Sequence, residues 1–321
     1  MSRHQEAAAL YSMLRIRRVE ERIEAEYPKQ EMRNPVHLCI GQEATAVGLS
    51  LHLSTNDKAM SGHRSHAHYL AKGGSLKRMI AELYGRSTGC CRGRGGSQHL
   101  IDESVGFLGA APILATTVPI CVGVAWSSKM TQDGAVVLAY FGDGATEEGA
   151  VHEALSFASL HKLPIIFVCE NNGLSTHTLI QDRQLDRPIA DIATAHAVKA
   201  MRVDGMNVQE VSRTAQEAVA IVRGGGGPIL IESRTYRFVG HVGPGLELNM
   251  GYRDQSDLDG WADPIAVETS RVAPLIRDWD AYARAMEIEI AREVDAAFSF
   301  ARSSPFPDAD ELTCDTYPRE T

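Results

Sequence analysis

The stretch FGDGATEEGAVHEALSFASLHKLPIIFVCENNGLSTHT, residues 141–178, decides the fold of this chain. It follows an apolar run, AVVLAY at 135–140, and it contains a second one, PIIFVC at 164–169. Between the two runs, residues 150–160 have helical spacing. Uninterrupted apolar runs separated by a helix are typical of parallel strands that are buried on both faces. The stretch therefore predicts two parallel strands joined by a helix.

Apolar segments beyond this stretch extend the sheet. Residues 198–203 and 228–231 predict two more strands, and the second of them follows the glycine run at 224–227. Strands of this kind alternating with helices predict an α/β fold, with a mostly parallel sheet and helices on both of its faces. Between Pro35 and about Gly109, the density of Gly, His and Arg predicts ligand-facing loops carried between helices.

Extra helices are expected at both ends of the chain. Helical periodicity covers residues 4–27, and a long helical segment runs from about 279 to 301, before a Pro- and Asp-rich tail that we expect to be flexible. Three parts are predicted: an N-terminal helical extension at 1–34, a central α/β domain at 35–265 that carries the ligand-facing loops, and a C-terminal helical segment with its tail at 266–321.

The GDG turn after the first strand suits a phosphate group and a cation. Gly142 and Gly144 flank Asp143 at the carboxyl end of that strand, and helical sequence follows almost at once. Ligands of open α/β sheets bind at this edge, where glycines allow close backbone approach and a helix N-terminus favours phosphate. Because a carboxylate repels phosphate, Asp143 is expected to hold a divalent cation that bridges to it.

A second group of oxygen ligands, Glu170-Asn171-Asn172, follows the next strand. One helix and one strand separate the two groups, so both are expected at the same edge of the sheet. Mg²⁺ prefers six oxygen ligands and takes only a few of them from protein. The predicted protein ligands are Asp143, Asn172 and the backbone carbonyl of Leu174.

This pair of motifs resembles the thiamine diphosphate signature, and the resemblance continues along the chain. The similar segments are HLCIGQEATAVG (37–48), GHRSHAHYLAKG (62–73), AELYGRSTGCCRGRGGSQHL (81–100), VPICVG (118–123), VDGMNV (203–208) and GPILIESRTYRFVGH (227–241). In this order they look like the α subunit of the thiamine-diphosphate-dependent decarboxylase component of 2-oxo acid dehydrogenase complexes. Pyruvate, acetoin and branched-chain enzymes belong to that group.

The resemblance implies roles for individual residues. It implies that Arg64 binds the diphosphate, that His66 lies near the reaction centre, and that His241 contacts the diphosphate in a loop that closes the site. His66 and His241 are the catalytic candidates, and the imidazole of His241 is expected to titrate near neutral pH. The cofactor-binding candidates are His63, Arg64, Pro112, Leu114, Gly142, Gly144, Ala145, Asn172 and His241; the metal candidates are Asp143, Asn172 and Leu174.

Three features depart from the family pattern. His63-Arg64 stands where a Tyr-Arg pair is common, and residues 112–115 read Pro-Ile-Leu-Ala where Gly-Ile-Val-Gly lines the aminopyrimidine ring. His241 is followed by VGPG, without the Ser-rich loop in which some relatives are phosphorylated. Contacts through the carbonyl of Pro112 and the N–H of Leu114 can survive the second change.

The function that the resemblance implies is decarboxylation of a pyruvate-like 2-oxo acid, with transfer of the acyl unit to a lipoyl or other acceptor. Thiamine diphosphate supplies the electron sink for this chemistry. In the family, the glutamate that contacts the pyrimidine ring lies on a separate domain, so the expected partner is a β subunit in an α₂β₂ assembly, with a lipoyl acyltransferase as a further partner. The alternatives are an acyloin-forming carboligase subunit and a non-catalytic, cofactor-binding regulatory subunit.

Composition narrows the remaining choices. The formal charge of −9 argues against a nucleic-acid-binding surface, and no run of 18 uncharged apolar residues predicts a membrane span. The charged N-terminal sequence does not resemble a signal peptide, so a cytoplasmic location is expected. The six cysteines form no C-x-x-C pair, and His63, His66 and His68 lack an obvious fourth zinc ligand.

The role of Glu43, in the IGQEA segment, is left open by the sequence. Helix capping or packing is at least as reasonable for it as a catalytic role.

Overall fold

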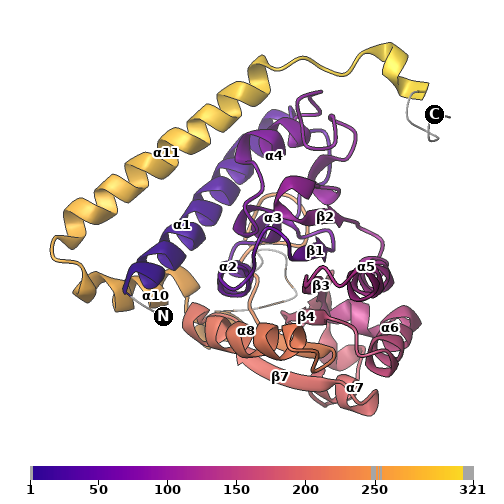
Figure 1. Ribbon diagram of the computed structural model, residues 1–321. Coiled ribbons are helices and arrows are strands. Elements are labelled where there is room, and N and C mark those ends of the chain that lie inside the picture. Colours follow the sequence, from indigo (N-terminus) through magenta and orange to yellow (C-terminus); the bar gives the residue numbers. More distant parts are fainter. Residues whose placement is uncertain (1–2, 247–250, 252, 254, 314–321) are drawn as a thin grey trace.

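A parallel six-stranded sheet forms the centre of the protein, seen here in a computed structural model that describes residues 3–246, 251, 253 and 255–313 (Figure 1). All neighbouring strands in it are parallel, and their order is β2-β1-β3-β4-β8-β7. The strands are β1 (Lys58–Ser61), β2 (Phe107–Ala110), β3 (Val137–Gly142), β4 (Ile165–Asn171), β7 (Lys199–Asp204) and β8 (Ile229–Arg234). A small antiparallel hairpin, β5 (Leu174–Ser175) and β6 (Thr178–Leu179), follows β4.

The predicted strands after residue 134 are confirmed, whereas β1 and β2 were not predicted. Both fall in the region expected to hold only loops and helices, and each has four residues. KAMS contains no apolar run, and FLGA, although apolar, lies in the stretch whose content of Gly, His and Arg predicted loops. Between β3 and β4 the register pairs Gly142 with Glu170, so the two predicted ligand groups do end at the same edge.

Helices cover both faces of the sheet, which explains why its central strands are apolar throughout. Val137, Ala139 and Phe141 of β3 point to one face, and Leu138 and Tyr140 point to the other. The first face packs against α5 (Thr117–Thr131), α6 (Gly149–Leu160) and α7 (Ala190–Ala195). The second face packs against α2 (Glu43–Ser50), α3 (His66–Ala71) and α8 (Val208–Arg223), with α1 (Arg3–Glu26) beyond them.

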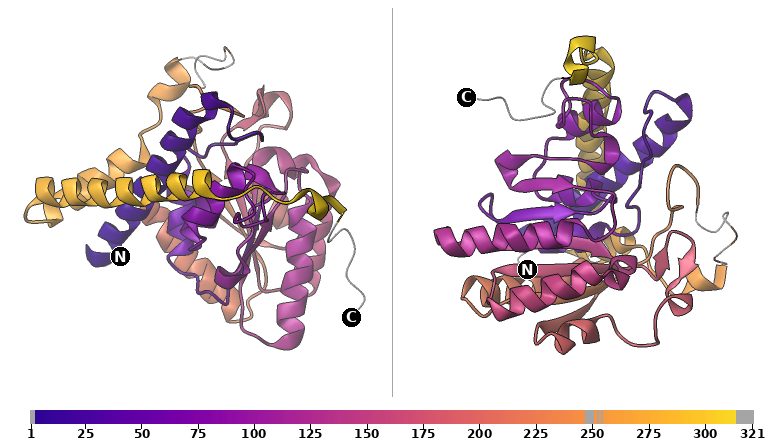
Figure 2. Two further views of the ribbon diagram at one scale, coloured as in Figure 1. Left: turned by 90° about the horizontal axis from the view of Figure 1, so that it is seen from above. Right: turned by 90° about the vertical axis from the view of Figure 1, so that its right-hand side faces the viewer.

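The expected terminal helices are confirmed, and they pack on each other. The C-terminal helix α11 (Trp279–Ser303) runs beside α1 and also packs on α4 (Leu76–Leu83), as Figures 1 and 2 show. Arg15 of α1 is 2.7 Å from Glu293 of α11. Two shorter helices, α9 (Gln255–Asp259) and α10 (Pro264–Val272), precede α11.

One hydrophobic cluster contains Leu10 of α1, Leu138 of β3 and Phe298 of α11. It therefore includes residues of all three predicted parts, and the three-part division stays a prediction. Residues 314–321 of the expected flexible tail lie outside the described residues.

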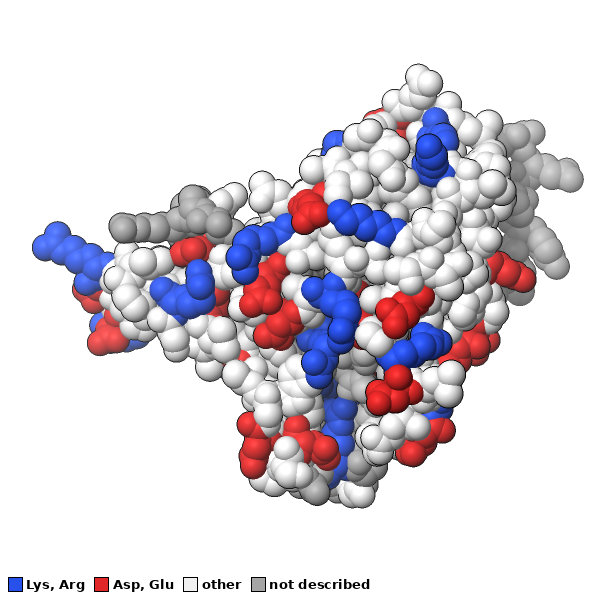
Figure 3. Space-filling view, turned by 90° about the horizontal axis from the view of Figure 1, so that it is seen from below, with Lys and Arg blue, Asp and Glu red and all other residues white. Residues whose placement is uncertain are grey.

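The surface carries charges of both signs. On the face in Figure 3, basic and acidic side chains are interspersed, as 32 basic and 41 acidic residues lead one to expect. Within the described part of the chain, no helix combines the length and the hydropathy that crossing a membrane requires.

The cap of α8 offers a test of local stability. The Asn207 side chain accepts hydrogen bonds from the backbone N–H groups of Gln209 and Glu210, in the VDGMNV segment. We expect Asn207→Ala to lower the free energy of unfolding by about 1 kcal/mol, because the first turn of α8 loses its acceptor. Urea denaturation measures this change. Asn207→Asp keeps an acceptor and is the matched control; an equal loss in both variants would contradict the capping role.

Candidate active site

A cavity of about 370 Å³ lies at the carboxyl ends of the strands. The loops that follow β1, β2, β3, β4 and β8 all contribute to it, as expected for a ligand site of a parallel sheet. Most of the predicted cofactor and metal residues line it: His63, Arg64, Pro112, Leu114, Gly142, Asp143, Gly144, Asn172, Leu174 and His241. Ala145 is not among the lining residues; it is buried and packs in the core beneath the turn.

The GDG turn presents a buried carboxylate to this cavity. Asp143 is fully buried, and one of its oxygens, Oδ1, has no hydrogen-bond partner among the described residues. The other oxygen is paired with Arg183. Burial raises the pKa of Asp143 to about 6, against the opposing effect of Arg183. A buried carboxylate that lacks a partner on one side is a suitable ligand for a cation.

Close packing explains one of the two glycines of the turn, Gly144. A Cβ on Gly144 would lie 2.5 Å from Oγ of Ser175, so the approach of β5 requires glycine there. A Cβ on Gly142 or on Gly62 would meet nothing within 4 Å, although both residues line the cavity. The turn after β3 is a short 3₁₀ helix, Asp143–Glu147, and α6, which was predicted at residues 150–160, begins at Gly149.

Asn172 lies at the adjacent strand end, beside the same cavity. Its Oδ1 accepts a hydrogen bond from the N–H of Leu174 at 3.0 Å, and its Nδ2 donates to Gln42 at 3.1 Å. These contacts fix the direction of the amide oxygen. With Asp143 and the backbone of Leu174, it provides an all-oxygen set of the kind that Mg²⁺ prefers.

Basic side chains border the cavity and hold its loops. Arg64 donates to the carbonyl oxygen of Leu38 and, at 3.1 Å, to that of His241. Arg237 is buried; it donates to the carbonyl oxygen of Thr176 at 3.2 Å and lies 3.4 Å from Nδ1 of His241. Two guanidinium groups beside the cavity favour an anionic ligand.

Three histidines, His37, His63 and His241, meet at the cavity, and each has a lowered pKa. Burial is the largest cause for all three, and nearby cationic groups such as Arg64 add to it. The pKa falls to about 2 for His37, about 3 for His63 and about 4 for His241. The expectation that His241 titrates near neutral pH is therefore wrong for the protein without its ligand, where the ring is neutral. A bound anion would shift this pKa upward.

The predicted catalytic role of His66 does not fit its position. This side chain is fully buried and is not among the cavity-lining residues. Its Nδ1 is 2.7 Å from Glu20, and its Nε2 is 2.7 Å from Ser97. Both ring nitrogens are thus used in packing α3 against α1 and the segment that contains Ser97. The alternative of zinc bound by His63, His66 and His68 fails for the same reason.

Glu43 is a packing residue, which is one of the roles that the sequence left open. It is fully buried and forms an ion pair with Arg17 of α1 at 2.5 Å. It also accepts a hydrogen bond from the N–H of Gly41 at 3.0 Å. Its carboxylate is therefore not available to a ligand.

The segment at 112–115 lies at the edge of the cavity. Ala115 has φ of 62°, in the left-handed region that favours glycine, at the position where the family pattern has one. Leu114 lines the cavity and is 40% exposed, and Ile113 is 70% exposed. The segment thus has a backbone conformation that suits the glycine of the family pattern, and alanine is strained in it.

Sequence reasoning missed several cavity residues. Besides Glu170, which was noted only as a possible oxygen ligand, they include His37, Gln42, Gln98 and Arg237. His37 and Gln42 belong to HLCIGQEATAVG, and Arg237 to GPILIESRTYRFVGH. Those segments carried the family resemblance, which was the available signal for a functional role.

Comparison with known proteins agrees with the geometry. The family described as dehydrogenase E1 component matches residues 11–310. The α subunit of an acetoin:2,6-dichlorophenolindophenol oxidoreductase from Bacillus subtilis (strain 168) is 36% identical, covering 95% of this chain and 91% of the relative. The pyruvate dehydrogenase E1 component α subunits of Zymomonas mobilis and Rhizobium meliloti (strain 1021) are 37% and 34% identical, covering 94% and 98% of this chain and 85% and 90% of the relatives. The chain therefore belongs to the dehydrogenase E1 component family, as an α-type chain of the thiamine-diphosphate-dependent 2-oxo acid dehydrogenases.

Proposed function

We propose that this chain binds the diphosphate end of thiamine diphosphate through Mg²⁺ and serves the decarboxylation of a pyruvate-like 2-oxo acid. The observation that carries the proposal is the buried Asp143, whose Oδ1 lacks a partner among the described residues at the edge of the cavity. Asp143, Asn172 and the carbonyl of Leu174 hold the metal. The open space beside Gly62 and Gly142 admits the phosphate groups.

Side chains of this chain orient the cofactor and exclude water from it. Arg64 and Arg237 border the cavity and attract the negative diphosphate, and His241 beside them is a hydrogen-bonding group for it. The cofactor supplies the electron sink for loss of CO₂. The loop that carries His241 is joined to the body by the hydrogen bond from Arg64, so diphosphate binding and loop position are linked.

A β subunit completes the site in this proposal. Glu43 is engaged with Arg17, and Glu170, at the end of β4, lies 3.3 Å from His68, so neither is assigned to the pyrimidine ring. Large apolar side chains are exposed on two adjacent helices and beside the cavity: Ile113, Ile120 and Met130 in or near α5, and Phe157 and Leu160 of α6. Exposed apolar side chains that lie together are typical of interaction sites. They support an α₂β₂ assembly with a β subunit on this side.

The acyl acceptor is proposed to be the lipoyl group of an acyltransferase. Relatives named for acetoin and for pyruvate resemble the chain almost equally, at 36% and 37% identity. Sequence identity therefore does not choose between their substrates, and both pyruvate and acetoin belong in the assay.

Because the proposed cofactor site is shared between this chain and a β subunit, we predict that the purified chain alone has no turnover. Adding its β subunit should produce decarboxylation that depends on thiamine diphosphate and Mg²⁺, because the pyrimidine-side carboxylate comes from the partner. The measurement is CO₂ release from pyruvate, with the β subunit alone as the control. Turnover by this chain without any partner would show that one of its own carboxylates had been wrongly set aside.

A further inference from the structure

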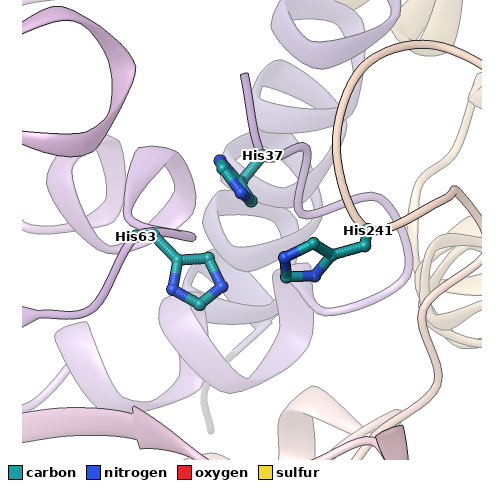
Figure 4. Close-up of side chains that lie close together, drawn as sticks. All are labelled: His37, His63 and His241. Carbon is teal, nitrogen blue, oxygen red and sulfur yellow. The ribbon is translucent and has the colours of Figure 1, made fainter. Parts of the chain in front are cut away.

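Three imidazoles from distant parts of the chain surround one space at the edge of the cavity. Figure 4 shows His37, His63 and His241 with their rings turned toward it. The ring centroids are 4.7 Å apart for His37 and His63, 5.0 Å for His37 and His241, and 5.4 Å for His63 and His241. The rings are inclined to one another by 63° to 81°, so none of them stacks on another.

This arrangement offers nitrogen ligands from three directions. One ring nitrogen of each histidine lies within 4.8 Å of those of the other two. Around a tetrahedral Zn²⁺, with bonds of about 2.0–2.1 Å, ligand nitrogens are separated by about 3.4 Å, so small ring rotations complete the geometry. Three histidines with a fourth position open to water or an anion form a known type of zinc site.

The backbone around these histidines is already held in place. Arg64, next to His63, donates to the carbonyl oxygens of Leu38 and His241 and so ties together the three segments that carry the rings. Gln98 lies 3.2 Å from Nδ1 of His37, which orients that ring further. Contacts of this kind around metal-binding histidines hold the rings in position.

The two guanidinium groups nearby decide the nature of the fourth ligand. Arg64 and Arg237 disfavour a bare dication and favour an ion that carries an anionic ligand. The cavity of about 370 Å³ beside the histidines has room for a carboxylate or a phosphate.

We infer that, in the chain without thiamine diphosphate, His37, His63 and His241 form a binding site for a borderline transition-metal ion of the Zn²⁺ class, with ligands other than those proposed for Mg²⁺. Imidazole suits Zn²⁺, Co²⁺ and Ni²⁺, whereas the carboxylate and amide oxygens at Asp143 and Asn172 suit Mg²⁺. Because the site lies at the edge of the cofactor cavity and includes the loop of His241, a bound ion fixes that loop. His63 supplies the third ligand, at the position where the family commonly has tyrosine.

Metal titration of the untagged, metal-free full-length chain tests this inference. Zn²⁺ should bind with a stoichiometry of one ion per chain by calorimetry, and Co²⁺ should give the visible spectrum of a four-coordinate ion, which Zn²⁺ then removes. Excess Mg²⁺ should leave both signals unchanged. His63→Tyr and His241→Asn should each weaken Zn²⁺ binding by about 100-fold or more. Even a residue that only hydrogen-bonds to a metal ligand changes metal affinity by about 10- to 100-fold.

Matched variants separate this site from others. His196→Gln removes one ring of another close pair, since His152 Nδ1 and His196 Nε2 are 3.2 Å apart, and it should leave binding unchanged. Asp143→Asn should also leave Zn²⁺ binding unchanged, so failure of the Mg²⁺ proposal and failure of this inference are distinguishable. Folding of each variant is checked by circular dichroism. Binding that survives in both His63→Tyr and His241→Asn, or that is lost in Asp143→Asn or His196→Gln, overturns the inference.

Discussion

Asp143→Asn is expected to weaken thiamine diphosphate binding to the assembled α/β protein by about 1,000-fold. The substitution keeps the shape of the side chain but removes the only charged ligand proposed for Mg²⁺. Loss of one partner of a buried charge pair costs about 3–5 kcal/mol, and about 1.4 kcal/mol corresponds to a tenfold change in affinity. Asp143 is fully buried, so solvent cannot replace the missing charge.

Calorimetric titration of the assembled protein with thiamine diphosphate, with and without Mg²⁺, measures this effect. Glu147→Gln is the matched control, because Glu147 shares the partner Arg183 with Asp143 but does not line the cavity. Its affinity should stay close to that of the wild type. If EDTA leaves the wild-type affinity unchanged, or if both variants lose it equally, the carboxylate does not act through a metal.

His241→Ala is expected to lower acceptor-dependent turnover by about 100-fold or more, the scale of a positioned acid, base or electrostatic contact. The assembly and the Mg²⁺ site should stay intact. The reason lies in the backbone: Arg64 donates to the carbonyl oxygen of His241, and alanine keeps that carbonyl. The variant therefore removes the imidazole without releasing the loop.

Turnover assays with different acceptors measure this effect and separate the remaining functions. His177→Ala is the matched control, since His177 is exposed and its ring centroid lies 6.4 Å from that of His241. Reductive acylation of lipoyl domains by the wild type supports the dehydrogenase, and formation of acyloins alone supports the carboligase. If no acceptor is used by the α/β assembly although the cofactor binds, the regulatory alternative stands. If His241→Ala equals the wild type with every acceptor, the loop has no catalytic role.

Local patterns in the sequence were sufficient to predict the central strands of the sheet. The apolar runs before Gly142 and Glu170 predicted adjacent parallel strands, because strands covered by helices on both faces must be apolar throughout. The same reasoning brought Asp143 and Asn172 to one edge of the sheet. The pairing of the strands and the meeting of Asp143 with Asn172 both involve neighbouring strands that are separated in the sequence by a single helix.

The family resemblance supplied residues that periodicity cannot. Arg64 and His241 have no distinguishing pattern of their own, since a lone arginine or histidine in a loop is usually a surface residue. Their motifs were recognisable, and the cavity includes both. The same transfer was misleading for His66, whose neighbours Glu20 and Ser97 come from other parts of the chain.

The sequence by itself determined the α/β class, the family, and the edge of the sheet at which Asp143 and Asn172 lie. Only the tertiary structure decided which other side chains meet at that edge. His37 precedes the first strand, His63 follows it and His241 lies beyond the last, yet their rings are about 5 Å apart. The short strands β1 and β2 and the pairing of Glu43 with Arg17 were decided in the same way. The physical reason is that local periodicity reports which face of an element is buried, whereas the partner of a buried polar group is set by packing between elements far apart in the chain.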